Sequence, residues 1–142
     1  MRKLLISTFV LLVAFMLKAQ EAKQVEQTVK AGPQIAVEEK VHQFGTITQG
    51  DVVEHTFMFK NIGTEPLKIL SARGSCGCTV PKYSKDEIAP GKEGEVLVRF
   101  NSAGKLGNQN KTVTLMTNSV DEKPMILTIR GVVQKETVDG KH

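Results

Sequence analysis

The chain has 142 residues, of which 40% are hydrophobic and only 5% are aromatic, and it carries a formal net charge of +4. This length supplies one domain with its own core and is too short for two. Charges of both signs are interleaved, and no basic run alternates with stacking aromatic residues. The composition therefore excludes a nucleic-acid-binding protein.

The N-terminus has the pattern of a secretory signal. Arg2 and Lys3 precede an apolar run from Leu4 to Leu17. This run is shorter than the roughly 20 residues of a transmembrane helix, but it suits the apolar core of a signal peptide. We predict a signal peptide at residues 1–19, with an uncleaved N-terminal anchor as the alternative. Removal of this segment leaves 16 basic and 15 acidic residues, which is a net charge of +1.

The same pattern predicts the location of the protein. After cleavage no integral membrane span is expected, so the protein should be exported to the periplasm, the cell surface or the medium. Polar residues 20–33 contain no aromatic residue and end at Gly32-Pro33, which predicts a flexible N-terminal segment. Residues 134–142 predict a C-terminal tail. The folded domain is expected at residues 34–133.

Within this window, hydrophobic residues recur with a period of two. Val53, His55, Phe57 and Phe59, for example, share one side of an expected strand. Turn-forming residues separate eight such runs, and no convincing helix lies between them. The expected strands are residues 34–38, 41–47, 52–60, 66–73, 77–83, 94–101, 111–117 and 125–133. The side chains expected to face inward are Val53, Phe57, Phe59, Val96, Val98, Phe100, Val113, Leu115, Leu127 and Ile129.

The regular spacing of these strands predicts an all-β fold: an immunoglobulin-like antiparallel β-sandwich of seven to eight strands. The chain has no tryptophan, and its two cysteines, Cys76 and Cys78, are separated by one residue. The Cys…Trp…Cys core of antibody domains is therefore absent.

Several short sequence patterns occur in order along the same window. They are Val41-His42-Gln43-Phe44-Gly45-Thr46-Ile47 followed by Gly50, Phe57-Met58-Phe59-Lys60-Asn61-Ile62-Gly63, Pro66-Leu67-Lys68-Ile69, Ser75-Cys76-Gly77-Cys78-Thr79 with Pro81, Ile88-Ala89-Pro90-Gly91, Gly94, Phe100, and Leu127-Thr128-Ile129-Arg130-Gly131-Val132. This combination resembles a family of exported bacterial proteins classed as a domain of unknown function. That family is related to the Hydin-type immunoglobulin-like domains, which share a major-sperm-protein-like sandwich. The resemblance covers roughly residues 34–133. It implies the fold, an exported location and a Cys-Gly-Cys-Thr loop, and it supplies no catalytic residues.

Cys76 and Cys78 are the candidate site residues, and three interpretations of them are open. They could form a disulfide if Gly77 bends the backbone, remain free structural thiols, or bind a soft metal ion such as Cu(I). Closing so short a loop contributes only about 1.6 kcal/mol through the unfolded state. We predict a disulfide that exchanges with small thiols, because an exported protein meets an oxidising environment.

Other chemistry is sparse. His55 lies on the apolar side of its strand and is expected to be a satisfied core histidine, and His42 has no clear spacing relation to the cysteines. Asp86 and Glu87 are adjacent carboxylates in a loop and are expected to form a solvated turn. No hydrolase, zinc-protease or phosphate-loop pattern occurs, so we predict no enzyme activity and no cofactor.

Two functions from different classes follow from these observations. The first is a non-catalytic exported module of the bacterial cell envelope that binds or organises protein partners, by analogy with other sandwiches of this type. The second is a small redox-active or soft-metal-handling protein that uses the loop from Cys76 to Cys78.

Overall fold

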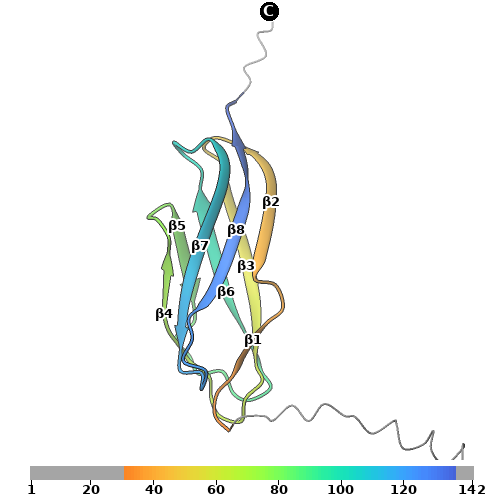
Figure 1. Cartoon of the computed structure of the whole chain (residues 1–142), viewed down its shortest axis with the longest axis vertical. Helices are drawn as coiled ribbons and strands as arrows, with labels where there is room; N and C mark the ends of the chain where they lie inside the picture. The colour runs from red at the N-terminus through yellow and green to blue at the C-terminus, as the bar shows by residue number, and fades with distance from the viewer. Residues whose placement is uncertain (1–30, 137–142) are drawn as a thin grey trace, which may run out of the picture.

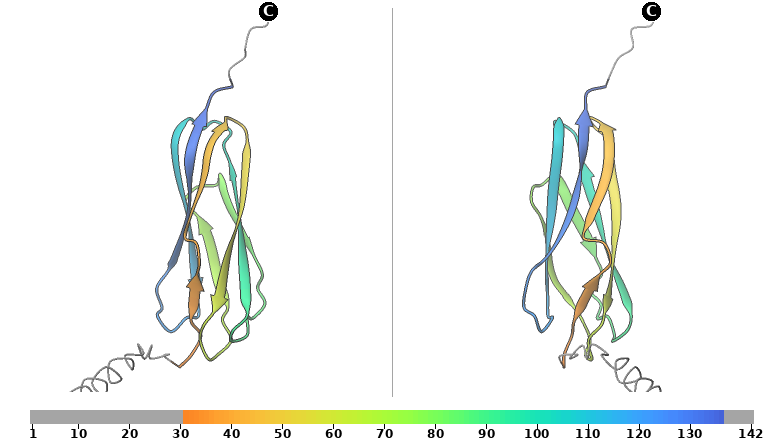
Figure 2. Two further views of the ribbon diagram at one scale, coloured as in Figure 1. Left: turned by 90° about the vertical axis from the view of Figure 1, so that its right-hand side faces the viewer. Right: turned by 45° about the vertical axis from the view of Figure 1, so that its right-hand side comes forward.

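The computed structural model describes residues 31–136, which form two four-stranded sheets packed face to face (Figures 1 and 2). The first sheet, called the β3–β6 sheet below, has the order β1 (Ile35–Val37), β3 (Val52–Asn61), β6 (Glu93–Asn101) and β5 (Thr79–Tyr83). The second, called the β7–β8 sheet, has the order β2 (Val41–Thr48), β8 (Met125–Gln134), β7 (Gly107–Thr117) and β4 (Ile69–Gly74). Among the described residues, no helix is long and apolar enough to cross a membrane.

The predicted β-sandwich is confirmed, with eight strands in the predicted order. The largest difference in strand bounds is in β7, which starts at Gly107 and not at residue 111. Residues 107–110, Gly-Asn-Gln-Asn, have weak strand propensity, but each pairs with a residue of β8. Pairing with a neighbouring strand therefore overrides local propensity at this end of β7.

The first two strands lie along one edge of the sandwich but belong to different sheets (Figure 1). β1 pairs with the end of β3, and the chain then crosses at residues 38–40 to place β2 beside β8. Because of this crossing, β2 pairs with β8 in parallel, whereas every other strand pair within the described residues is antiparallel.

The β2–β8 ladder contains a register shift between Gln43 and Gly45. Gly45 has a φ of +73°, a conformation that favours glycine. Opposite it, a Cβ on Gly131 would collide with the ring of Phe44 and with the carbonyl oxygen of Gly45. Both glycines are therefore required for β2 to lie against β8 while Phe44 turns into the sandwich.

The core lies between the two sheets. All of the side chains predicted to face inward belong to it, with Val53 only partly buried at its margin. Leu67, Ile69 and Val133 are also buried in this core. Apart from Leu67 and Val133, every hydrophobic core residue that is less than 2% exposed was predicted to face inward. This agreement confirms the period-two assignment.

Two residues before the predicted start of the domain contact the sandwich. Gly32 and Pro33, predicted to end a flexible segment, are buried in the structure. Gly32 exchanges two hydrogen bonds with Thr64, and the carbonyl of Pro33 accepts one from the N–H of Val120. The predicted signal peptide, most of residues 20–33 and the end of the predicted tail lie outside the described residues.

Candidate functional site

The loop that carries the two cysteines joins the two sheets. It connects β4, an edge strand of the β7–β8 sheet, to β5, an edge strand of the β3–β6 sheet. On one side the N–H of Ser75 donates to the carbonyl of Thr112 at 2.8 Å. On the other side the N–H of Asn101 donates to the carbonyl of Cys78 at 2.9 Å. The loop is thus fixed to both layers of the sandwich.

The Sγ atoms of Cys76 and Cys78 lie at bonding distance, and the Cα atoms are 5.2 Å apart. The two residues belong to a tight turn in which the N–H of Thr79 donates to the carbonyl of Cys76 at 3.1 Å. The buried hydroxyl oxygen of Thr79 lies 3.5 Å from Sγ of Cys76 and 3.9 Å from Sγ of Cys78. Since bonded sulfurs carry no hydrogen, the hydroxyl of Thr79 is the donor to them.

The loop is open to solvent on its outer side. Both cysteines are half-buried, whereas Gly77 between them is exposed and has open space where a side chain would project. A shallow hollow of about 380 Å³ adjoins the loop and is lined by Gly77, Cys78, Val80, Lys82, Arg99 and Asn101. Of the two cysteines, Cys78 lines this hollow. While the sulfurs are joined, neither cysteine offers a thiolate to a metal ion.

A second group of polar side chains lies at the opposite edge, where the chain crosses between sheets. His42 on β2 and His55 on β3 stack face to face, with ring centroids 3.6 Å apart and planes inclined by 10°. Glu39 reaches both rings: its carboxylate oxygens lie 3.8 Å from Nδ1 of His42 and 3.5 Å from Nε2 of His55. The histidines are mostly shielded, with 26% and 21% of their side chains exposed.

His55 was predicted to be a satisfied core histidine, and this prediction is wrong. The ring does face inward and lies nearly perpendicular to the ring of Phe57, with the ring centroids 4.6 Å apart. Its Nε2, however, is buried and makes no hydrogen bond of good geometry, so the contact with Glu39 is an ion-pair distance only. Burial and the neighbouring charge of His42 lower the pKa of His55, while Glu39 opposes this shift.

No pattern in the sequence links these three residues. His42 and His55 lie on strands of different sheets, and parallel pairing of β2 with β8 brings them together. The one available signal was local: Glu39 precedes His42 by three residues, a spacing that allows contact across a turn.

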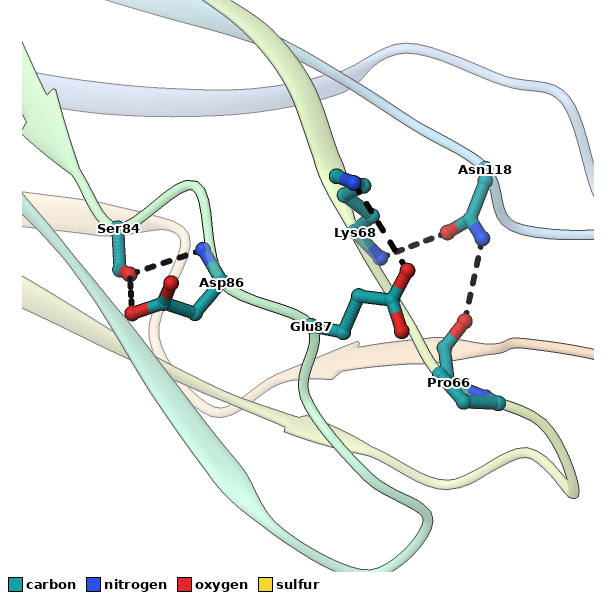
Figure 3. A network of polar contacts seen from close by, with 6 residues as sticks. All are labelled: Pro66, Lys68, Ser84, Asp86, Glu87 and Asn118. Carbon is teal, nitrogen blue, oxygen red and sulfur yellow. Dashed lines mark hydrogen bonds and ion pairs between the residues drawn. The ribbon is translucent and has the colours of Figure 1, made fainter.

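Asp86 and Glu87, expected to form a solvated turn, are both exposed and have separate partners (Figure 3). Asp86 accepts a hydrogen bond from the hydroxyl of Ser84 at 2.8 Å, and that hydroxyl accepts one from the N–H of Asp86. Glu87 instead points toward Lys68, whose Nζ lies 3.8 Å away. Asp86 thus stabilises the turn and Glu87 pairs with a lysine, so the two carboxylates do not face a common position that a substrate could occupy.

The outer faces of the two sheets differ in charge. The charged side chains that project outward from the β3–β6 sheet are Glu54, Lys60, Lys82, Glu93, Glu95 and Arg99. The charged side chains that project outward from the β7–β8 sheet are Arg73 and Arg130. Lys111 is not one of them, because it lies opposite buried Ile129 and therefore belongs to the inner side. The exposed apolar residues of that outer face are Val41, Leu70, Met116, Ile126 and Val132, with exposed fractions of 38–59%. Its remaining outward residues are mainly threonine, asparagine and glutamine.

Together the layers, strand order and edge crossing define an immunoglobulin-like, PapD-like β-sandwich domain. The sequence matches the family described as Protein of unknown function (DUF1573) over residues 35–133, and the chain belongs to that family. Among curated proteins, none matches the chain.

Solved structures share the fold at low sequence identity. A protein of unknown function from Porphyromonas gingivalis W83 is 12% identical with a TM-score of 0.63, and the match covers 78% of this chain and 51% of that one. This chain thus spans about half the length of that protein. PapD-like domain 7 of human CEP192 is 13% identical with a TM-score of 0.54, and 71% of this chain and 85% of that one are covered. The VesB protease of Vibrio cholerae is 16% identical with a TM-score of 0.57, over 70% of this chain and 31% of that one.

Proposed function

We propose that the chain is a non-catalytic, exported module of the cell envelope that binds a protein partner through the outer face of the β7–β8 sheet. Membership of a family of unknown function and a likeness to PapD-like domains support a binding module. The apolar run after Arg2 and Lys3 supports export. The ordered sequence patterns of residues 34–133 support a relation to the Hydin-type and major-sperm-protein-like domains.

The charge distribution of the outer face carries the proposal. Protein interfaces are depleted of charged residues at their centre and enriched in methionine and arginine, because burying an unpaired charge is costly. The outer face of the β7–β8 sheet is depleted of charged residues in this way, whereas the outer face of the β3–β6 sheet carries acids and bases together. No strand residue that projects outward from the β7–β8 sheet, within the described chain, is acidic.

Exposed apolar side chains gather at one end of this face. Ile126 on β8 is opposite Thr114, the residue two positions before Met116 on β7. Met116 is in turn opposite Ser71, the neighbour of Leu70 on β4. Leu70, Met116 and Ile126 thus form a row across three strands, with Leu70 59% exposed. Such a row is a suitable anchor for a partner.

Contact through side chains is favoured over addition of a strand at the adjacent edges. Pro81 removes a backbone donor from edge strand β5, and edge strand β4 has a register shift between Ile69 and Ser71. Both features hinder the pairing of a further strand. A partner is therefore expected to lie on the face of the β7–β8 sheet and not to extend this sheet at β4.

Site-specific photo-cross-linking in cells tests this proposal. A photoreactive residue at position 114, on the outer face of central strand β7, should give a discrete protein adduct. The same residue at position 56 is the matched control, because Thr56 projects outward from central strand β3 of the other sheet. Adding Met116→Glu should abolish the adduct at position 114, since it places an acid in the apolar row.

Equal adducts at positions 56 and 114, or adducts at position 114 that survive Met116→Glu, would contradict the proposed face. Cell fractionation of the same strain tests export separately. Recovery of the protein in the cytoplasm would overturn export without bearing on which face binds.

A redox role for the cysteine loop is the second candidate function, and the hydroxyl of Thr79 favours it. An incoming thiolate would attack one sulfur, form a mixed disulfide and release the other cysteine as a thiolate. The Thr79 hydroxyl, close to both sulfurs, could donate to that leaving thiolate and stabilise it. If this role holds, Thr79→Val should exchange its disulfide with glutathione more slowly than the wild-type protein does.

A further inference from the structure

Glu39, His42 and His55 form a polar group whose parts come from both sheets. Glu39 lies in the crossing segment after β1, His42 is the second residue of β2, and His55 lies within β3. Their potential ligand atoms all lie within 4.8 Å of one another, and no other group of three such residues is found in the described chain. The group contains neither cysteine and is separate from the face proposed to bind a protein.

We propose that Glu39, His42 and His55 form a binding site for a divalent transition metal ion, with Zn²⁺ as its ion. Imidazole nitrogen and carboxylate oxygen are ordinary Zn²⁺ ligands, and two histidines with one glutamate are a known zinc donor set. Mg²⁺ and Ca²⁺ are disfavoured here because they prefer all-oxygen coordination. Three protein ligands leave one tetrahedral position for water.

The ligand atoms lie within 4.8 Å of one another and must move closer to bind one ion. Tetrahedral Zn²⁺ with ligands at about 2.0–2.2 Å holds its donor atoms about 3.3–3.6 Å apart. The carboxylate of Glu39 is already 3.5 Å from Nε2 of His55 and 3.8 Å from Nδ1 of His42. The rings lie nearly parallel, so they must tilt about their own side-chain torsions before both lone pairs can meet one ion.

An unsatisfied buried atom points to a ligand at this position. Nε2 of His55 is buried and has no hydrogen-bond partner of good geometry, a state that costs free energy unless something binds it. The ring of His55 packs nearly perpendicular to that of Phe57, and its Nε2 lies 3.5 Å from the carboxylate of Glu39. The carboxylate itself is on the surface, with 53% of the Glu39 side chain exposed, which provides a path for an ion.

A bound ion would join the two sheets where the chain crosses between them. His42 belongs to the β7–β8 sheet and His55 to the β3–β6 sheet, so their shared ion would tie β2 to β3. Since the ligand atoms meet only in the folded protein, binding must stabilise the native state. Zinc would therefore stabilise the sandwich at the edge where the chain crosses from one sheet to the other.

Titration of the purified full chain with zinc chloride tests the site. Isothermal titration calorimetry should give one ion per chain, and excess zinc should raise the melting temperature by a few degrees over the chelator-treated protein. Glu39→Gln and His42→Ala should each weaken binding by at least about tenfold, since loss of an outer-shell partner alone costs about 10–100-fold. Glu39 is exposed, so Glu39→Gln is expected to fold.

Two control variants distinguish this site from other donors. His142→Ala removes the third histidine of the sequence, which lies outside the described residues, and should leave the affinity unchanged. The Cys76→Ser, Cys78→Ser double variant should also retain zinc. Nitrogen-15 NMR of the histidine rings should show zinc-dependent shifts at Nδ1 of His42 and Nε2 of His55.

Several results would overturn the proposal. These are the absence of binding at one equivalent of zinc, unchanged affinity in both Glu39→Gln and His42→Ala, and loss of binding in the cysteine double variant. The last result would assign the metal to the thiols.

Discussion

Asn61 is fully buried, and its side-chain amide joins separate loops at one end of the sandwich. Its Nδ2 donates to the carbonyls of Glu65 and Ile88 at 2.7 and 2.8 Å, and its Oδ1 accepts from the N–H of Gly63 at 3.0 Å. The sequence pattern Phe-Lys-Asn-Ile-Gly includes this residue, but nothing in that pattern shows that the amide is buried. Long-range polar contacts of this kind have no periodic signal in a sequence.

We expect Asn61→Ala to lower the free energy of unfolding by at least about 2 kcal/mol, because each buried group left unpaired costs about 1–3 kcal/mol. Urea denaturation measures this loss. Asn118→Ala is the matched control: Asn118 also bridges two backbone groups, Lys68 and Pro66, but is exposed (Figure 3). Water can replace its bonds, so a loss of similar size in both variants would contradict the argument.

The cysteine pair gives a second prediction for single residues. The Cys76→Ser, Cys78→Ser double variant should remain folded, with a loss of about 1.6 kcal/mol and a melting temperature a few degrees lower, because the loop closed by the bond is short. Hydrogen bonds from both sheets still hold the loop in this variant. Thermal unfolding followed by circular dichroism measures the change. A collapse of the fold would make the pair a structural element of the core.

At the scale of strands, alternation predicted most of the fold. β3, β6, β7 and β8 each place apolar residues on one side because that side is buried between the sheets. Alternation does not say which strands share a sheet, so the crossing between β1 and β2 and the parallel β2–β8 pair were not predicted. The cysteine loop could be found from the sequence because its residues are adjacent along the chain. The group of Glu39, His42 and His55 could not, because its members meet only through the arrangement of the strands.

Replacing Gly131 tests the parallel pair directly. We expect Gly131→Ala to cost about 1–3 kcal/mol, the usual range for an overpacked site, because the new Cβ meets the Phe44 ring and the backbone oxygen of Gly45. Amide hydrogen exchange should also become faster in β2. Gly77→Ala is the control, since its Cβ would project into open space, and it should cost less than about 0.5 kcal/mol. Slow exchange of β2 in Gly131→Ala would show that the strand tolerates the added methyl group.

At the scale of the whole molecule, the three proposed functional features occupy different parts of one domain. The proposed protein-binding surface is the outer face of the β7–β8 sheet, while the zinc group lies at the edge where β1 gives way to β2 (Figure 1). The cysteine loop lies at the other edge, between β4 and β5. Removal of any one of these features should leave the other two measurable, which makes their tests independent.

The N-terminal limit of the domain gives the last prediction. Gly32 and Pro33 make three hydrogen bonds with the rest of the domain, at distances of 2.9–3.0 Å. Two join Gly32 to Thr64, one of them to the Thr64 hydroxyl, and in the third the N–H of Val120 donates to the carbonyl of Pro33. Each of these hydrogen bonds contributes about 0.5–1.5 kcal/mol, so a chain starting at Gln34 should be less stable than one starting at Ala31 by about 1.5–4.5 kcal/mol. Both chains should end at residue 136, and guanidinium denaturation compares them. Equal stability would place the start of the domain at residue 34, as the sequence pattern alone predicts, and would make the contacts of Gly32 and Pro33 energetically neutral.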